Sequence, residues 1–464
     1  MRRYGYDHFL DTARGKAAQH GKRRLREIHV HLHEEPRAKG KRARSDAAVR
    51  EAVAESMTRH GRRPFLGAVA LELHFHTQAK NPPSIELLAK RYLDLLGPQK
   101  IKGSGRRWPA LFIDDRQVKL LQVVSDHGWG RVAGSPTGLV PEEKPWIWVR
   151  ARPMRDVVAD LALARDLHLD DRDPWDDDED DPFGGPKFDD QAEEDDLELL
   201  RRVRRGEPRT WLTDYVEYRV RDRNQRRLMH VADAELLDIL CDRLPVLLPA
   251  LAEARARYRE EMLRKPQPPP LALSLLRDGM LGTGYISLSL ARLPSNSEST
   301  KVFLQRVEAA VERFREKARW LSPLVRSLRV TMLVTPSAIS AAAAARKDWN
   351  DRDGGKDLDN IMLLVLPIVH RVMQPPAEPW LQRGPHKEPL SEKQAAALKR
   401  LRSLHEYTVT AFQVIELPRR DGDPSEGQLV LVLGDGERWS STWRQAIDYA
   451  DKRLDQLREE EDRW

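Results

Sequence analysis

The feature that most constrains the fold is an internal repeat of one strand and the proline that follows it. Residues 28–36 read Ile-His-Val-His-Leu-His-Glu-Glu-Pro, and residues 286–294 read Ile-Ser-Leu-Ser-Leu-Ala-Arg-Leu-Pro, so the segments align without a gap. Both alternate apolar and polar residues with the period of two that is typical of a half-buried strand. The repeat predicts a chain built from two copies of one unit, although two unrelated α/β domains would also explain it.

The elements expected after each repeated strand have the same order. In the first copy they are a helix (46–58), a strand (68–75), a helix (85–96), two strands (121–124 and 146–149) and a helix (154–167). In the second copy the corresponding residues are 302–320, 328–334, 358–372, 412–415, 429–433 and 442–457. The predicted fold class is therefore α/β, an α+β sandwich of two tandem units with the order β–α–β–α–β–β–α.

Charge divides the chain further. Residues 170–198 hold 16 acidic residues against two basic ones, so the remainder of this chain of net charge +6 carries +20. An acidic block with few apolar residues predicts disorder. The expected organisation begins with a basic N-terminal arm (1–25) and a first unit (26–168). An acidic disordered linker (169–198) and a helical middle segment (199–270) follow, and a second unit (271–464) completes the chain.

Composition excludes several classes of protein. Apolar residues make up 40% of the 464 residues, which is enough for real cores. No apolar run is long enough to span a membrane, and the N-terminus has no secretory leader, so we expect a cytoplasmic protein without a membrane partner. The single cysteine, Cys241, excludes an internal disulfide and a cysteine-rich zinc site.

Clustered cations favour nucleic acid as the partner, with a merely solubilising surface as the alternative. The residues expected to contact phosphates are Arg37, Lys39, Lys41, Arg42 and Arg44. The acidic linker or the helical middle segment is a candidate contact for a protein partner.

Two carboxylates open a helix in the second copy. Asp357 and Asp359 stand two residues apart after Gly354-Gly355, and Asn360 follows them. Carboxylates that converge in this way suit Mg²⁺, while Asn360 can orient a ligand. The alternative is that an aspartate or Asn360 only caps the helix.

The first copy supplies complementary residues. Asp114 and Asp115 stand at the entrance of a strand, and Lys90 follows Glu86 by one helical turn. A lysine there can stabilise negative charge in a phosphoryl-transfer transition state. The alternative is an ordinary pair between Lys90 and Glu86 on the helix surface.

These residues resemble the RusA-like Holliday junction resolvases. The resemblance is carried by Lys356-Asp357-Leu358-Asp359-Asn360, by Tyr92-Leu93-Asp94-Leu95-Leu96 and by Asp114-Asp115-Arg116-Gln117-Val118, with the repeated strand and the basic segment 39–44. It covers about residues 26–165 and 284–457. It implies an Mg²⁺-dependent endonuclease, with Mn²⁺ as a substitute, that cuts opposed strands of a four-way DNA junction. Because that family works as a homodimer, two copies imply a covalent pseudo-dimer, either monomeric or dimerised further.

Neither copy keeps the whole pattern. The first lacks the paired helix-start aspartates, and the second has Leu363 where the lysine would stand, with His405-Glu406 at the Asp-Asp position. Three outcomes follow. The second copy forms the active site from Asp357, Asp359 and Glu406, supported by Asn360 and His405, and the metal or Lys90 of the first copy stabilises the departing oxygen. The first copy binds metal through Glu86, Asp114 and Asp115. In the third outcome neither site is active, which leaves a junction-binding or scaffold protein.

Histidines and tryptophans form a weaker signal. His29, His31 and His33 alternate along one strand, and His74 and His76 repeat the alternation. They suit either a metal-binding face or simply a polar outer face. Trp108, Trp129, Trp146 and Trp148 are candidates for stacking on unpaired bases near the first site, or for ordinary core positions.

Overall fold

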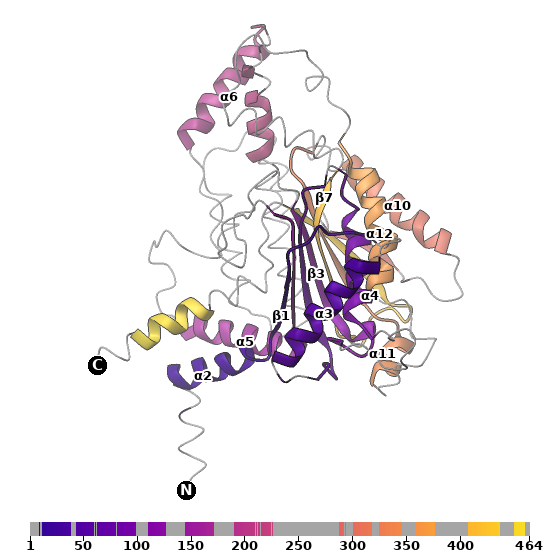
Figure 1. The fold of residues 1–464 in the computed structure, drawn as a ribbon. Helices are drawn as coiled ribbons and strands as arrows, with labels where there is room; N and C mark the ends of the chain where they lie inside the picture. Colours follow the sequence, from indigo (N-terminus) through magenta and orange to yellow (C-terminus); the bar gives the residue numbers. More distant parts are fainter. Residues whose placement is uncertain are drawn as a thin grey trace.

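A computed structural model describes the chain in separate stretches. They are Phe9 and residues 12–38, 43–59, 61, 63–79, 81–98, 110–126, 144–170, 190–208, 210, 212–213, 215–223, 225, 287–291, 293, 300–317, 324–345, 358–375, 407–436 and 450–459. Within them the protein is of the mixed α/β class, with one eight-stranded sheet and helices on both faces (Figure 1). None of the helices described in these stretches has the length and apolar character needed to cross a membrane.

The sheet has two halves, which we define by their strands. The first half contains β1 (Ile28–Leu32), α3 (Ala43–Arg59), β2 (Val69–His76), α4 (Ile85–Leu96), the short 3₁₀ turn η1 (Asp115–Gln117), β3 (Val118–Asp126), β4 (Trp146–Pro153) and α5 (Met154–Asp170). The second half contains β5 (Ser287–Ala291), α10 (Thr300–Lys317), β6 (Leu328–Thr335), α11 (Ala338–Ala345), α12 (Leu358–Met373), β7 (Val409–Glu416), β8 (Gln428–Asp435) and a C-terminal helix (residues 450–459).

The strand order is the same in both halves when each is followed outward from the centre. The sheet runs β1-β4-β2-β3-β7-β6-β8-β5, with β3 and β7 paired antiparallel where the halves meet. In each half the parallel pair lies inside, and two antiparallel pairings complete the outer part. Gln122 and Gln413 face each other at the centre of the β3–β7 pairing.

The pairing register is also shared by the two halves. The parallel pair of the first half shifts register between Val69 and Ala70, and that of the second half shifts between Leu328 and Arg329. Beyond the shift, Glu72 pairs with Gln122 and Thr331 pairs with Gln413. The two halves therefore correspond residue by residue about the central glutamine pair.

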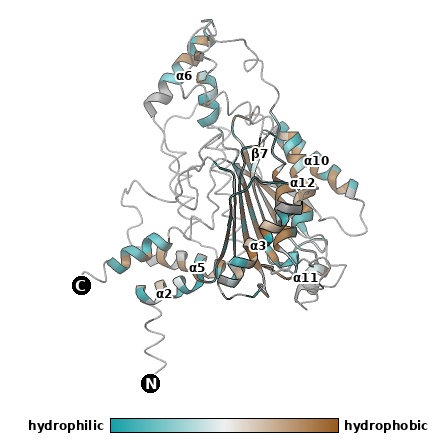
Figure 2. Ribbon diagram, viewed as in Figure 1, coloured by the Kyte–Doolittle hydropathy of each residue, from teal (hydrophilic) through white to brown (hydrophobic). Residues whose placement is uncertain are grey.

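One face of the sheet is apolar and covered by helices. Because side chains alternate along a strand, the residues that face these helices fall on every second position, for example Leu71, Leu73 and Phe75 of β2, all fully buried. Helices α3, α4, α12 and α10 cover this face, and α4 packs against α12 at the boundary between the halves (Figure 1). Figure 2 shows hydrophobic residues concentrated on the strands and on α12.

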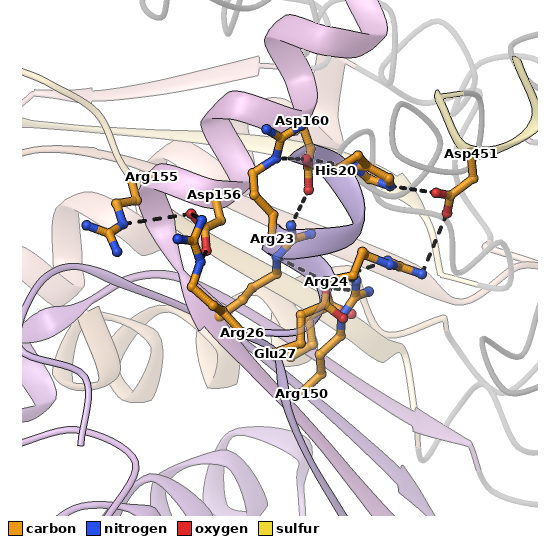
Figure 3. A network of polar contacts seen from close by, with 12 residues as sticks. His20, Arg23, Arg24, Arg26, Glu27, Arg150, Arg155, Asp156, Asp160 and Asp451 are labelled. Carbon is orange, nitrogen blue, oxygen red and sulfur yellow. Dashed lines mark hydrogen bonds and ion pairs between the residues drawn. The ribbon is translucent and has the colours of Figure 1, made fainter. Parts of the chain in front are cut away.

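The opposite face carries the terminal helices and a network of ion pairs. Helix α2 (Ala13–Arg24) packs on α5, and the C-terminal helix lies beside them (Figure 1). His20 bridges Asp160 of α5 and Asp451 of the C-terminal helix, with ring nitrogens 2.9 and 2.6 Å from the carboxylate oxygens (Figure 3). The two ends of the chain are thus joined beneath the first half.

Two expectations need correction. Residues 1–25 were expected to form a basic arm, but residues 13–24 form helix α2, capped by Thr12 and packed on α5. The acidic block was expected to be disordered as far as residue 198, but helix α6 (Asp190–Arg204) begins at Asp190; residues 171–189 lie outside the described residues. In α6, Asp196 is buried and pairs with Arg219 and Arg223, which offsets the repulsion between neighbouring acids.

The two halves also meet in a way that the sequence did not predict. The expected units were to be joined by the acidic linker and the middle segment, and the structure adds a direct pairing of the halves in one sheet through β3 and β7. The middle segment contacts the second half: Gln225 accepts a hydrogen bond from the Val325 amide at 2.9 Å, and Asp222 pairs with Arg326 at 2.6 Å.

Candidate functional site

The candidate site lies where α4 of the first half packs against α12 of the second. Both helices are apolar on the face toward the sheet, where Leu88 and Tyr92 of α4 and Ile361 and Val365 of α12 are fully buried. This packing leaves the first turn of α12 beside the middle of α4. Residues of α4 and α12, which are far apart in the sequence, therefore meet at the boundary between the halves.

A cross-half ion pair forms the core of the site. Lys90 of α4 donates a hydrogen bond from Nζ to Oδ2 of Asp359, a carboxylate that is only 3% exposed. Oδ1 of Asp359 accepts from the Asn360 amide at 2.7 Å, in the first helical turn, where the helix dipole favours negative charge. Lys90 also lies 3.3 Å from Asp94, one turn further along α4. Lys90 therefore pairs with Asp359 and Asp94, and no Lys90–Glu86 ion pair occurs among the described residues.

The Asp114–Asp115 turn is held rigidly by one buried glutamine. Asp114 caps η1 by accepting from the Arg116 amide at 2.9 Å. Oε1 of Gln117 accepts from the amides of Ile113 and Asp114 at 2.7 and 2.9 Å, and its Nε2 donates to the carbonyls of Phe65 and Gly67, both at 2.9 Å. Four hydrogen bonds from one 2% exposed side chain fix the turn relative to the segment before β2.

Electrostatics join this turn to the ion pair. Burial raises the pKa of the Asp115 carboxyl, and the charges of Asp359 and Asp114 raise it further, while the Lys90 ammonium opposes the rise. Burial tends to lower the pKa of Lys90, but its bonds to Asp359 and Asp94 outweigh burial and raise it. Excess negative charge thus gathers around one lysine, and Asp115 holds a proton more readily than an ordinary aspartate.

The structure brings expected residues of both halves together at one place. Asp359 of the second half lies with Lys90 and the Asp114–Asp115 turn of the first. Within the described residues, Glu86 makes no hydrogen bond or ion pair with this group. Several predicted residues fall outside the described residues: Asp357, His405, Glu406, Lys39, Lys41 and Arg42. Arg37 is exposed, and Arg44 lies in α3.

The described residues include only part of the expected metal-binding set. Over the described stretches, no group of three His, Cys, Asp or Glu side chains could hold a metal ion. Asp359 is engaged by Lys90. The expected set of Asp357, Asp359 and Glu406 has only Asp359 inside the described residues.

The histidines and tryptophans of β1, β2 and β4 lie on the opposite face of the sheet. Trp148 packs with Val124 and Ala411, apart from the main core, and the ring of Trp146 is surrounded by those of His31, His74 and His76. Trp146 and Trp148 therefore do not line the candidate site, and Trp108 and Trp129 lie outside the described residues. His29 and His31 are exposed, whereas His74 and His76 are buried. His76 pairs with Asp126 at 3.3 Å, and His29 pairs with Glu27 at 3.2 Å.

Sequence reasoning combined Lys90 with Asp357, Asp359 and Glu406, but it assigned Asp114 and Asp115 to a separate site in the first copy. The sequence offered a signal for the contact between the halves: the first copy has the lysine without the helix-start aspartates, and the second has the aspartates without the lysine. The structure brings Lys90 and Asp359 together. Gln117 and Asp94 were part of the resemblance, but their roles required coordinates.

Comparison with family models, with curated proteins and with solved structures finds no match to this chain. Function is therefore inferred from the residues and their geometry.

Proposed function

We propose that the chain is a tandem RusA-like protein that binds branched DNA as a covalent pseudo-dimer and cuts it at one composite site. The Lys90–Asp359 pair carries the proposal, because it joins the two parts of the resolvase-like pattern that the copies retain separately. The shared strand order and register support the tandem duplication. A two-fold arrangement of this kind suits a four-way junction, whose arms are related by near two-fold symmetry.

The chemistry assigned to the site is hydrolysis of a phosphodiester. A water oxygen bonds to phosphorus, the bond from phosphorus to the leaving sugar oxygen breaks, and that oxygen takes a proton from solvent. Asp115 in its ionised form accepts the proton of the attacking water, a role that its raised pKa favours. Lys90 stays charged and stabilises negative charge on the phosphate, while Asp359 fixes the position of the ammonium.

A second candidate function is junction binding without cutting. One observation favours it: Asp359 is neutralised by Lys90, and the described residues contain no complete metal-binding set. The chain would then act as a DNA-binding scaffold, with the acidic linker or the middle segment as contacts for a protein partner.

One experiment separates these functions. A labelled synthetic four-way junction is incubated with the full chain in Mg²⁺, Mn²⁺ or EDTA, alongside linear duplex and single strand. The proposal predicts preferential junction binding and a cut product in Mg²⁺ or Mn²⁺ that is lost in Asp359→Asn. Binding without a product would favour the scaffold function, and neither binding nor cutting would contradict both. Cutting in EDTA would contradict the Mg²⁺ requirement that the resemblance implies.

A further inference from the structure

We infer that Leu66 and Ile113 form an apolar wedge that contacts unstacked bases at a DNA branch point, an inference that deepens the proposed function and rests on it. The wedge, defined as these two side chains, lies beside the Asp114–Asp115 turn of the candidate site. Phosphate contacts are available on any DNA. A contact to unstacked bases is therefore what separates a branch point from a continuous duplex.

The two side chains lie next to each other on neighbouring segments. Phe65 and Phe112 form a parallel β-bridge, and Leu66 and Ile113 are the residues that follow them. Because side chains alternate along an extended chain, the fully buried Phe112 points into the protein and Ile113 points away from it. Leu66 is 79% exposed and Ile113 is 49% exposed. Two large apolar side chains thus lie together at the surface.

One glutamine fixes the backbone of both segments. Nε2 of Gln117 donates to the carbonyl oxygens of Phe65 and Gly67, on either side of Leu66, both at 2.9 Å. Oε1 of the same side chain accepts from the Ile113 amide at 2.7 Å. The wedge is therefore held in place before DNA binds, and little conformational entropy of the backbone is lost on binding.

The wedge is continuous with the charged groups of the candidate site. Ile113 immediately precedes Asp114, whose amide donates to the same Gln117 oxygen at 2.9 Å. Asp115 is the next residue of the turn, and its carboxyl is subject to the charges of Asp359 and Lys90. Ile113 and the residue assigned to proton transfer thus belong to one rigid turn.

The size and surroundings of the wedge favour bases over a protein partner. A stable protein interface buries about 1,600 Å² in total, which requires many residues on each side. The wedge consists of two side chains, and the adjoining turn (residues 114–116) is charged. A single apolar side chain is enough to insert between bases and unstack them. Base pairs at a branch point lack a continuous stack, so unstacking them costs less than it does within a duplex.

The direct test measures unstacking. A synthetic four-way junction carries 2-aminopurine, whose fluorescence rises when the base unstacks, next to the branch point. The full chain is added in EDTA, so that the DNA stays uncut. The unmodified chain is expected to raise the fluorescence, and the double variant Leu66→Ala, Ile113→Ala is expected to lose most of that rise at saturating protein.

A competition titration with linear duplex measures the selectivity. The double variant is expected to bind the junction about tenfold more weakly and the duplex within about twofold of the unmodified chain, because only apolar contacts are removed. Ile113→Leu keeps the apolar volume and is expected to behave as the unmodified chain. The matched control is Leu25→Ala, because Leu25 is a 73% exposed leucine at the end of α2, on the opposite face of the sheet.

The outcomes separate the wedge from the proposed function. An equal rise in fluorescence with the double variant, or an equal loss with Leu25→Ala, would overturn the wedge. Junction binding by the unmodified chain without any rise would also overturn the wedge and leave the proposed function intact. Absence of junction binding by the unmodified chain would overturn both. Because both wedge residues are exposed, the urea midpoint of the double variant is expected to stay unchanged, so a loss of signal does not come from unfolding.

Discussion

The two halves of the sheet share a backbone pattern and differ in their side chains. Strand order and register agree, yet Arg150 corresponds to Val432, Arg152 to Gly434 and Glu72 to Thr331. The shared part of the pattern is the hydrogen-bonded ladder and the apolar face that α3, α4, α12 and α10 cover. Burial on that face holds the fold, whereas the side chains on the other face differ between the halves.

The helix-covered face shows the same contrast at the site. Glu86 and Lys90 of α4 correspond to Asp359 and Leu363 of α12, so each helix keeps one member of a pair. Because α4 and α12 pack together at the boundary, the two retained members still meet. The candidate site therefore contains residues from both halves.

The largest change in stability is expected from the ion network centred on Asp160 of the first half. Asp160 is fully buried and bonded to His20, Arg23 and Arg152. Asp160→Ala leaves these cations without their common carboxylate, which is expected to cost about 3–5 kcal/mol in urea unfolding. Asp451→Ala removes a half-exposed partner and is expected to cost about 1 kcal/mol or less. Equal losses would show that the network is not centred on Asp160.

The next largest effect is expected on the rate of junction cutting, and it distinguishes the acidic residues at the starts of α12 and α4. Asp359→Asn is expected to lower junction cutting at least about 100-fold while junction binding changes less than about threefold. Glu86→Gln, at the corresponding position of α4, is expected to retain cutting within about threefold. Cutting rates under single-turnover conditions provide the measurement. A larger loss from Glu86→Gln would place the chemistry in the first copy alone.

The bridge between the two ends of the chain predicts a pH dependence. Burial disfavours the charged form of His20, but hydrogen bonds to Asp160 and Asp451 outweigh it and raise the pKa to about 9 from 6.5. The stabilisation is fully present below pH 6.5 and is lost as pH rises toward 9, with an expected loss on the order of 2 kcal/mol. Urea unfolding across this range measures it, and His20→Asn should flatten the curve. A curve unchanged by His20→Asn would contradict the bridge.

The smallest effect is the coupling between Lys90 and Asp359. A double-mutant cycle of Lys90→Met and Asp359→Asn is expected to give a coupling free energy of about 1–2 kcal/mol in urea unfolding. Lys119 and Glu416, which lie 2.7 Å apart and also join the halves, form a more exposed pair with an expected coupling of about 0.5 kcal/mol. No coupling at Lys90–Asp359 would mean that the halves do not share this site.

Much of the fold followed from hydrophobic periodicity. The expected helix over 85–96 has the same bounds in the structure, and the expected strands over 68–75 and 328–334 agree within one residue. Helix α2 was missed because its residues are mostly polar and its stability comes from contacts with α5 and the C-terminal helix, which lie far along the chain. Hydrophobic periodicity indicates which residues are buried locally, and it does not indicate such long-range ion pairs.

The residues of the candidate site were selected from the sequence, and their grouping was anticipated in part. Lys90 was combined with Asp359, whereas Asp115 was assigned to a separate metal site in the first copy. These residues lie together because β3 pairs with β7 and α4 packs against α12. Such long-range contacts cannot be predicted from local sequence patterns. No sequence pattern indicated the contacts of Arg91, because its acceptors are two backbone carbonyls and one aspartate that lie far from it in the sequence.

The central claim is one composite cutting site per chain, and the most direct measurement counts incisions in a supercoiled plasmid that extrudes a cruciform. Paired cuts within one binding event give linear DNA, whereas a single cut gives nicked circles. With protein in excess at early times, the account predicts nicked circles in Mg²⁺ or Mn²⁺ and no cut product with Asp359→Asn. Linear product that appears without a nicked precursor would contradict it, because two cuts require two working sites.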